Sequence, residues 1–373
     1  MGTSADSKVS KTDSATIVVM GATGAGKSTF INLVSNSKFE VGYGLESCTS
    51  EVDVAAPFML DGKPVTLIDT PGFDDTVKTE AEILRLIAEF LSVTYKQGRT
   101  LHGIVFLQRI TDTRMGGVAR KNFRLFRKLC GDDTLRNVII ATNMWGNVEP
   151  ALGASREREM AESDLFFKPA LEKGAHMVRH DNTIESAHRI IREIIGFPPA
   201  PLQIQRETVD QRKPLAETGA GQDLRADLEQ QAGQHRAELA GLRSSIQELV
   251  ESKDARNRGE IQELNDSLRD VQTKLAKVQA EAHNLREEHE ASRNEHEEKI
   301  RQMTEVMTVR ETELRGLQEH AQTQKTQLVQ MESALHEAER RAEEATTAAA
   351  AAAKQRPPPR PRSRSRGGLC ILQ

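Results

Sequence analysis

The strongest constraint on the fold is one glycine-rich segment, Gly21-Ala22-Thr23-Gly24-Ala25-Gly26-Lys27-Ser28, which is followed by Thr29. The apolar run Ile17–Met20 precedes it and predicts a buried strand, whereas the spacing of apolar residues 30–34 predicts a helix. A strand, a glycine-rich loop and a helix in this order are typical of a phosphate-binding loop. The alternative is a glycine turn with a surface lysine, which the flanking strand and helix make the weaker interpretation.

Each residue type in this loop has a chemical role. Glycines allow the backbone N–H groups to face phosphate oxygens, and the start of the following helix adds the positive end of its dipole. Lys27 is expected to contact the outer phosphates, and the Ser28 hydroxyl is expected to bind Mg²⁺. The predicted loop contacts to nucleotide are Gly21, Gly24, Ala25, Gly26, Lys27, Ser28 and Thr29.

Composition divides the chain into two parts. No Trp, Tyr or Phe occurs after Phe197, and the rest is rich in Glu, Gln, Arg, Leu and Ala, so the globular core is expected in the first part. The net charge of −4 does not indicate a specific nucleic-acid partner, and three cysteines do not form a disulfide framework. We expect no membrane-spanning segment and no signal peptide.

The first part alternates between strand and helix patterns. After a polar arm at 1–14, we predict a G domain at 15–197 with the α/β fold of P-loop NTPases. Its strands are expected at 17–20, 52–58, 64–68, 103–107, 137–141 and 175–179. Three helices are predicted at 79–93, 118–129 and 183–195. A further helix is predicted to follow the glycine-rich loop and to end near 35, and another helical segment is predicted to end near 173. Such a pattern predicts a mostly parallel sheet with helices on both faces and a ligand at the carboxyl ends of the strands.

A second nucleotide motif, Asp69-Thr70-Pro71-Gly72, ends the predicted strand 64–68. Asp69 can hold Mg²⁺ through water, and the Gly72 N–H can contact a γ-phosphate. In the preceding loop, Thr49 is the preferred candidate for a switch threonine that binds Mg²⁺, with Ser47 and Ser50 as alternatives. The predicted metal ligands are therefore Ser28, Thr49 and Asp69.

These motifs, with Glu46-Ser47-Cys48-Thr49 and Asp69–Asp74, resemble the immunity-associated (GIMAP-type) G domains of the septin-related GTPases. Segments 108–114, 142–145 and 179–183 are similar to fungal members of that group. The resemblance covers residues 16–197 and implies binding of GTP or GDP with Mg²⁺. It also implies slow hydrolysis that is stimulated when two G domains pair.

Two positions depart from the usual GTPase pattern. Where a guanine-reading N-K-x-D is expected, the chain has Thr142-Asn143-Met144-Trp145; Asn143 can still hydrogen-bond, and Trp145 either stacks on a purine or belongs to the core. His180 follows the last strand, and a surface position is favoured over a base contact.

The second departure is Phe73, which replaces the water-orienting Gln, so unaided hydrolysis is expected to be slow. Arg109 and Arg114 are candidate arginine fingers, although solvent or salt-bridge roles are favoured.

The second part of the chain predicts a helical rod. Pro and Gly residues at 198–222 indicate a linker, and apolar residues at heptad spacing predict a coiled coil over 223–345. Its register shifts near 253–261 and 289–300, which we expect to alter the supercoil without ending it. At about 1.5 Å per residue, the rod would be on the order of 180 Å long. We expect a parallel homodimer, because only then do the C-terminal ends of both chains reach one membrane.

The end of the chain predicts a lipid anchor. Residues 346–373 are interpreted as a basic disordered tail, and the last four, Cys370-Ile371-Leu372-Gln373, form a C-a-a-X motif that indicates prenylation of Cys370. We therefore expect a GTP-binding switch or scaffold at the cytoplasmic face of a membrane, with a soluble pool. The alternative is a nucleotide-stabilised tether that does not hydrolyse nucleotide and acts through its coiled coil.

Overall fold

The computed structural model describes residues 14–39, 51–74, 78–112, 116–251, 258–286 and 290–354. The chain divides into two compact units, residues 1–314 and 315–373. Most of the predicted arm at 1–14, Thr49, Arg114 and Cys370 lie outside the described residues.

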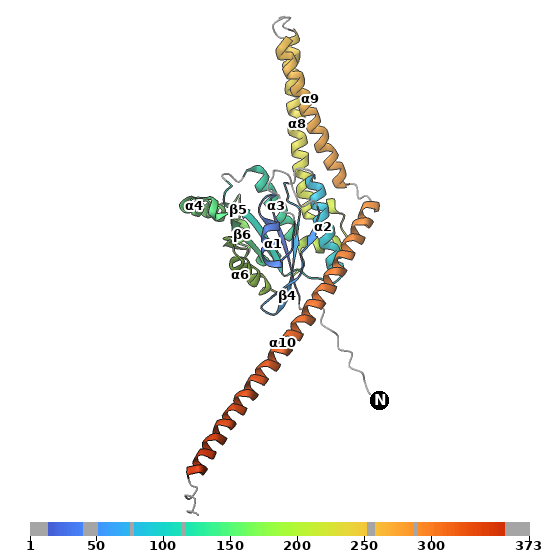
Figure 1. Ribbon diagram of the computed structural model, residues 1–373. Helices are drawn as coiled ribbons and strands as arrows, with labels where there is room; N and C mark the ends of the chain where they lie inside the picture. The colour runs from blue at the N-terminus through green and yellow to red at the C-terminus, as the bar shows by residue number, and fades with distance from the viewer. Residues whose placement is uncertain are drawn as a thin grey trace, which may run out of the picture. The chain divides into compact units, whose positions relative to one another are not determined.

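The described residues of the first unit form a sheet of seven strands (Figure 1). The strand order is β2-β4-β1-β5-β6-β7, and β3 also pairs with β4. β1, β4, β5, β6 and β7 are parallel, whereas β2 and β3 run antiparallel to β4. The strands are β1 (Ala15–Gly21), β2 (Asp53–Val54), β3 (Phe58–Leu60), β4 (Lys63–Asp69), β5 (Gly103–Arg109), β6 (Val138–Asn143) and β7 (His176–Arg179). The predicted mostly parallel G-domain sheet is confirmed.

Helices cover both faces of this sheet. On one face, α1 (Lys27–Ser35) and α6 (Ile184–Ile195) pack Phe30, Ile31 and Ile191 against β1, β4 and β5. On the other face lie α2 (Glu80–Lys96) and α3 (Gly117–Cys130), with η1 (Asp132–Asn137), η2 (Trp145–Asn147), α4 (Pro150–Glu162) and α5 (Lys168–Leu171) around them. Alternate residues of each strand therefore enter separate cores, because successive side chains point to opposite faces.

The helix ends follow local chemistry. Thr79 accepts a hydrogen bond from the Glu82 N–H, and the Glu82 carboxylate accepts one from the Thr79 N–H, so α2 begins with a capping box. α1 differs, because its N-cap residue is Gly26 and no side chain caps it. Four backbone N–H groups at that end are thus left for another acceptor.

Residues 198–222 are not the linker that Pro and Gly predicted. They form α7 (Gln203–Gln205), η3 (Arg206–Asp210), η4 (Leu215–Glu217) and the start of α8 (Gly219–Glu251). Leu202, Ile204 and Leu215 are buried in the core that contains α2. The Gln205 amide also donates to the Leu91 carbonyl at 2.9 Å. The prediction failed because these apolar side chains are too few to form a helical pattern, although each is buried in that core.

The predicted continuous rod is also corrected. α8 ends at Glu251, α9 spans Arg258–Arg286, and α10 spans Glu290–Lys354. Figure 1 shows α8 and α9 side by side, and Leu228, Ala232, Val278 and Leu285 from the two helices belong to one core. The heptad residues of this region therefore bury their apolar side chains within one chain. The two register shifts mark the places where helices end.

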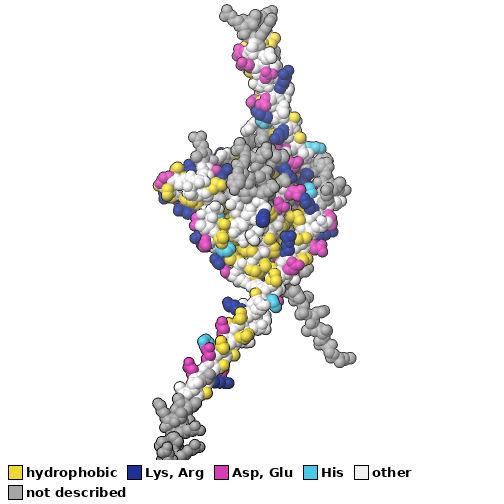
Figure 2. All heavy atoms as spheres, in the orientation of Figure 1, with side chains coloured by type: hydrophobic (Ala, Val, Ile, Leu, Met, Phe, Trp, Pro, Cys, Tyr) yellow, Lys and Arg dark blue, Asp and Glu magenta, His cyan; other side chains and the backbone are white. Residues whose placement is uncertain are grey.

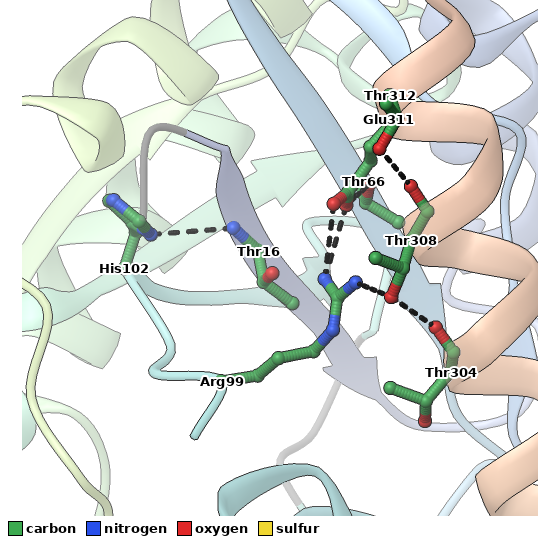
Figure 3. A network of polar contacts seen from close by, with 8 residues as sticks. All are labelled: Thr16, Thr66, Arg99, His102, Thr304, Thr308, Glu311 and Thr312. Atoms are coloured by element: carbon green, nitrogen blue, oxygen red, sulfur yellow. Dashed lines mark hydrogen bonds and ion pairs between the residues drawn. The ribbon is translucent and has the colours of Figure 1, made fainter. Parts of the chain in front are cut away.

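The first part of α10 completes the sheet face that contains α2. Ile300 is buried in that core, and Glu311 reaches β4, where its carboxylate accepts a hydrogen bond from Thr66 Oγ1 at 2.7 Å. Arg99 forms an ion pair with Glu311 at 3.2 Å and donates to Thr308 Oγ1 at 2.6 Å, as Figure 3 shows. The compact unit that holds the G domain thus extends to Leu314, not to 197.

The second unit contains the rest of α10. Leu317, Leu328, Met331 and Leu335 are each at least 59 % exposed along it, and Figure 2 shows hydrophobic side chains on the surface of this helix. α10 continues to Lys354, so the predicted boundary at 345 is too early. Alanine has the highest helix propensity, and the alanine run therefore extends the helix.

Candidate nucleotide-binding site

The glycine-rich loop joins the end of β1 to the start of α1, as its sequence predicts. Gly24 has φ 71° and Gly26 has φ 87°, values that favour glycine. The Ala25 N–H donates to the Ala22 carbonyl at 3.1 Å and closes the loop. The uncapped N-terminus of α1 therefore faces a loop that can hold an anion.

Lys27 lies across this loop. Its side chain is 6 % exposed, and its ammonium group donates to the carbonyls of Gly21 at 3.2 Å and Ala22 at 3.0 Å. Both acceptors belong to the loop itself, so the charge of Lys27 is held against the loop backbone. This position suits a cation that contacts phosphate oxygens.

Ser28 and Asp69 meet at the carboxyl ends of β1 and β4. Ser28 Oγ donates to Asp69 Oδ2 at 2.6 Å. Asp69 is 1 % exposed, and burial raises the pKa of its carboxyl group. Oxygen ligands of this kind suit Mg²⁺; Ser28 and Asp69 would hold the ion, which would supply charge neutralisation beside the buried carboxylate. The two side chains fit such an ion.

The second motif lies directly against the loop. A Cβ atom on Gly72 would be 2.2 Å from Thr23 Oγ1, so only glycine fits this close approach. The Thr23 N–H donates to the Asp74 carboxylate. Asp74 thus presents an anion to the loop backbone, as a phosphate group would, and it is a contact that the sequence motifs did not single out.

Arg109 also reaches the loop, from the end of β5. Its Nη1 atom lies 3.3 Å from the position of a Cβ on Gly24, and its Nε forms an ion pair with Asp112 at 2.9 Å. The favoured salt-bridge role is present, but the same guanidinium group lies beside the phosphate loop. Ala22, Asp74, Arg109 and Asp112 line a cavity of about 280 Å³.

Phe73 is 1 % exposed and belongs to the core around α2. An apolar side chain in the core cannot orient a water molecule at the phosphate. Polar side chains that line the cavity beside the loop include Asp74, Gln108 and Arg109.

Asn143 lies beneath the phosphate loop. Its amide nitrogen donates to the Ala25 carbonyl at 2.5 Å, and both residues are buried. Trp145 instead points toward α4: its indole N–H donates to the Thr142 carbonyl at 3.0 Å. The Arg179 guanidinium lies 4.1 Å from the ring centroid, so one face of the indole is covered. Trp145 is therefore a packing residue in this structure.

His180 is buried, which corrects the expectation of a surface histidine. It is 2 % exposed, and its Nδ1 is 2.8 Å from Ser186 Oγ. Its ring packs edge-on against Phe30 of α1 at 5.1 Å, and burial lowers its pKa. The sequence shows only that His180 follows a strand, which suits either solvent or the core. In the structure its N–H donates to the Thr142 carbonyl at 2.8 Å and continues the strand pairing, which places the ring inside.

Comparison with known proteins supports a GTPase domain. Residues 16–142 match the family described as 50S ribosome-binding GTPase. A curated relative, GTP-binding protein A from Dictyostelium discoideum, is 28 % identical over 138 residues. This match spans 36 % of the present chain and 29 % of the relative, so it covers less than a third of that protein.

Solved structures with a similar course of the chain include Toc33 from Arabidopsis thaliana in complex with Mg²⁺ and GMPPNP. That structure is 18 % identical, with a TM-score of 0.38, and the match covers 46 % of this chain and 72 % of Toc33. The G domain of the T. maritima FeoB iron transporter is 11 % identical, with a TM-score of 0.31 and coverage of 48 % and 96 %.

Proposed function

We propose that this protein is a guanine-nucleotide-dependent switch or scaffold that binds GTP and GDP with Mg²⁺ and hydrolyses GTP slowly. The observation that carries the proposal is the convergence of Lys27, Ser28 and Asp69 on one loop, with the 2.6 Å contact between Ser28 and Asp69. Arg109 and the N–H groups of the loop complete the set of groups that would contact phosphates.

Hydrolysis in this proposal depends on groups other than Phe73. The chain binds and orients the phosphates through Lys27, the N-terminus of α1 and Arg109, whereas the buried, apolar Phe73 stands at the position of the water-orienting Gln. Phosphoryl transfer relies on positioning and charge, so binding is expected to be strong and unaided turnover slow.

Base selection must use a residue outside the usual motif. Gly146 occupies the position where the guanine-reading Asp stands in N-K-x-D, and a Cβ there would meet open space. The neighbouring loop after β7 contains Asp181, whose pKa is held at about 2 by hydrogen bonds from Ser186 and Thr183. An ionised carboxylate accepts from the N1–H and amino groups of guanine, so Asp181 is the proposed guanine reader.

Competition titrations test the nucleotide assignment. GTP should displace a fluorescent GDP analogue at least about tenfold better than ATP, because adenine lacks the two donors that a carboxylate accepts. Asp181→Asn should shift this preference toward XTP, while Glu185→Gln, a nearby surface change, should leave it unchanged. Equal affinities for GTP and ATP in the parent would withdraw guanine specificity. If the parent prefers GTP and the Asp181→Asn variant keeps the same preference, only the proposed role of Asp181 would be withdrawn.

Self-association and membrane attachment extend the proposal. The exposed apolar residues of α10 beyond Leu314 keep heptad spacing, which supports pairing with a second copy, and pairing of G domains would add an arginine in trans. Prenylation of Cys370 with the basic run before it supports tethering at the cytoplasmic face of a membrane. None of the described helices is long and apolar enough to cross a bilayer.

The rival function is a tether that retains nucleotide without turnover. Phosphate release measured at rising protein concentration separates the two: a specific rate that increases with concentration supports the pairing GTPase, and bound GTP that persists unchanged supports the tether. Cys370→Ser tests the anchor in a cell-fractionation assay, in which the variant should leave the membrane fraction. Analytical ultracentrifugation of the full chain tests self-association.

A further inference from the structure

A second cavity lies against α2, and none of its described lining residues belongs to the nucleotide site. It has a volume of about 530 Å³. α2 contributes one face of the helix, the segment 208–215 forms a wall, and Leu285 of α9 and Glu297 of α10 contribute from the other helices. Pockets of a few hundred to a thousand Å³ are the usual size for small ligands.

The inner part of this cavity is apolar. Ala88 and Val93 of α2, Leu215 of η4 and Leu285 of α9 line it and are at most 8 % exposed. Ser92 is an uncharged polar residue on the same helix face, but its hydroxyl already bonds to Thr208 Oγ1 at 2.6 Å. A hydrocarbon chain suits this inner part better than a polar ligand.

The charges around the cavity are unequal. Four basic side chains (Arg85, Lys96, Arg212 and Lys213) line it against two carboxylates (Glu89 and Glu297). Glu297 pairs with Lys96 at 2.9 Å, Glu89 contacts His296 at 2.9 Å, and Lys213 pairs with Glu207 at 3.7 Å, so both acids and two of the four bases are engaged. Within the described part of the chain, Arg212 takes part in no ion pair, and it is exposed. The positive charge at the rim of the cavity is therefore concentrated at Arg212, beside the Lys213–Glu207 pair.

The wall that carries Arg212 has an unusual backbone. Residues Arg206–Asp210 form a π-helical turn, and Arg212 has φ 53°. Single π-turns and non-glycine residues in the left-handed region are unfavourable and are concentrated at functional sites. A glycine at 212 would relieve this strain, yet the chain places a cation there, at the rim of an apolar cavity.

We propose that this cavity binds a single-chain anionic amphiphile, with its hydrocarbon chain among Ala88, Val93 and Leu285 and its headgroup at Arg212 and Lys213. The ligand would contact α2, which follows the Asp69–Gly72 motif, together with the helices that pack on α2. Carboxylate and phosphate headgroups share the chemistry that this rim recognises.

Isothermal titration of the full-length protein tests the proposal with four probes, each below its critical micelle concentration. With the nucleotide site first saturated with GDP and Mg²⁺, laurate and dodecyl phosphate should bind with one site per chain, dodecanol should bind about tenfold more weakly, and inorganic phosphate should not bind. A preference between laurate and dodecyl phosphate identifies the headgroup class. Dodecanol that binds as tightly as laurate would overturn the role of the rim.

Two variants locate the site. Ala88→Phe fills the inner cavity and should abolish binding of all three amphiphiles. Arg212→Gly should weaken the two anions several-fold, leave dodecanol unchanged, and raise the melting temperature or leave it unchanged, because glycine suits φ 53°. A purely structural role for Arg212 would not separate binding from stability in this way.

The matched control is Arg120→Ala, which removes one charge at an exposed position of α3. If both Ala88→Phe and Arg212→Gly bind laurate as the parent does, the site is elsewhere; if Ala88→Phe does not fold, Arg212→Gly alone decides.

Discussion

Removal of the Glu311 carboxylate should destabilise the first unit although the residue lies over a hundred positions beyond the last strand. Glu311 is 7 % exposed and Thr66, its partner in β4, is fully buried. Glu311→Ala leaves the Thr66 hydroxyl and the Arg99 guanidinium without the acceptor that Figure 3 shows. Hydrogen bonds to charged groups contribute about 1.5–3 kcal/mol each, and a broken buried pair costs about 3–5 kcal/mol.

We expect a loss of about 3 kcal/mol in the free energy of unfolding, since Arg99 keeps its bond to Thr308 and is partly solvated. Thr66→Val removes the hydroxyl but keeps the shape of the side chain, and should cost about 1 kcal/mol. The double variant should cost about 1 kcal/mol less than the sum, because valine leaves no buried donor to satisfy.

Urea unfolding followed by circular dichroism and by Trp145 fluorescence measures these changes. Trp145 lies in the G domain, so its signal reports on the sheet and not on the helices alone. Glu313→Ala, which changes an exposed carboxylate on the same helix, is the matched control and should change stability by less than about 0.5 kcal/mol. A Glu311→Ala variant as stable as Glu313→Ala would refute the view that α10 is part of this fold.

Three other outcomes follow from the site and the core. Lys27→Ala should lower GTP affinity about a hundredfold by calorimetry, since a buried cation over the loop is lost; an unchanged affinity would contradict the phosphate-loop assignment. Asp74→Ala should raise affinity several-fold, because its carboxylate competes with phosphate for the Thr23 N–H, and weaker binding would show instead that Asp74 organises the loop. Burial lowers the pKa of His102, whose Nδ1 accepts the Thr16 N–H at 3.3 Å. The stability that this neutral histidine supports is present above its unfolded pKa of 6.5 and is lost as pH falls toward the folded value; His102→Gln should flatten this dependence in urea midpoints measured between about pH 7 and 5.

The strands and helices of the G domain were predictable because their periodicity is local. Val18 and Ile68 lie on one face of the sheet, and Ile17 and Leu67 on the other, so the parallel strands read as continuous apolar runs. The heptads beyond 223 were misleading, because an a/d stripe shows that a helix packs against another helix but does not show whether that helix belongs to the same chain or to a second copy. Val278 meets α8 of the same chain, and that choice depends on tertiary contacts absent from the periodicity.

The site was predictable where the motif gives each residue type a single role, as it does for the glycines of the loop, Lys27 and Ser28. His180 and Asp74 were less accessible, because a histidine or an aspartate after a strand suits either solvent or a site. Their positions depend on Phe30 and Thr23, which lie far from them in sequence. Thr49 and Cys370 stay predictions, since both lie outside the described residues.

The contact between α10 and β4 has a consequence for biosynthesis. Residues 15–197 leave the ribosome well before Ile300 and Glu311, which complete the core over α2 and β4. At about 5–20 residues per second, the nascent domain spends several seconds or more with Thr66 and the surrounding apolar surface uncovered. The emerging chain is therefore expected to need chaperone protection over this interval. A ribosome that stalls between residues 200 and 300 would expose an incompletely folded, aggregation-prone domain.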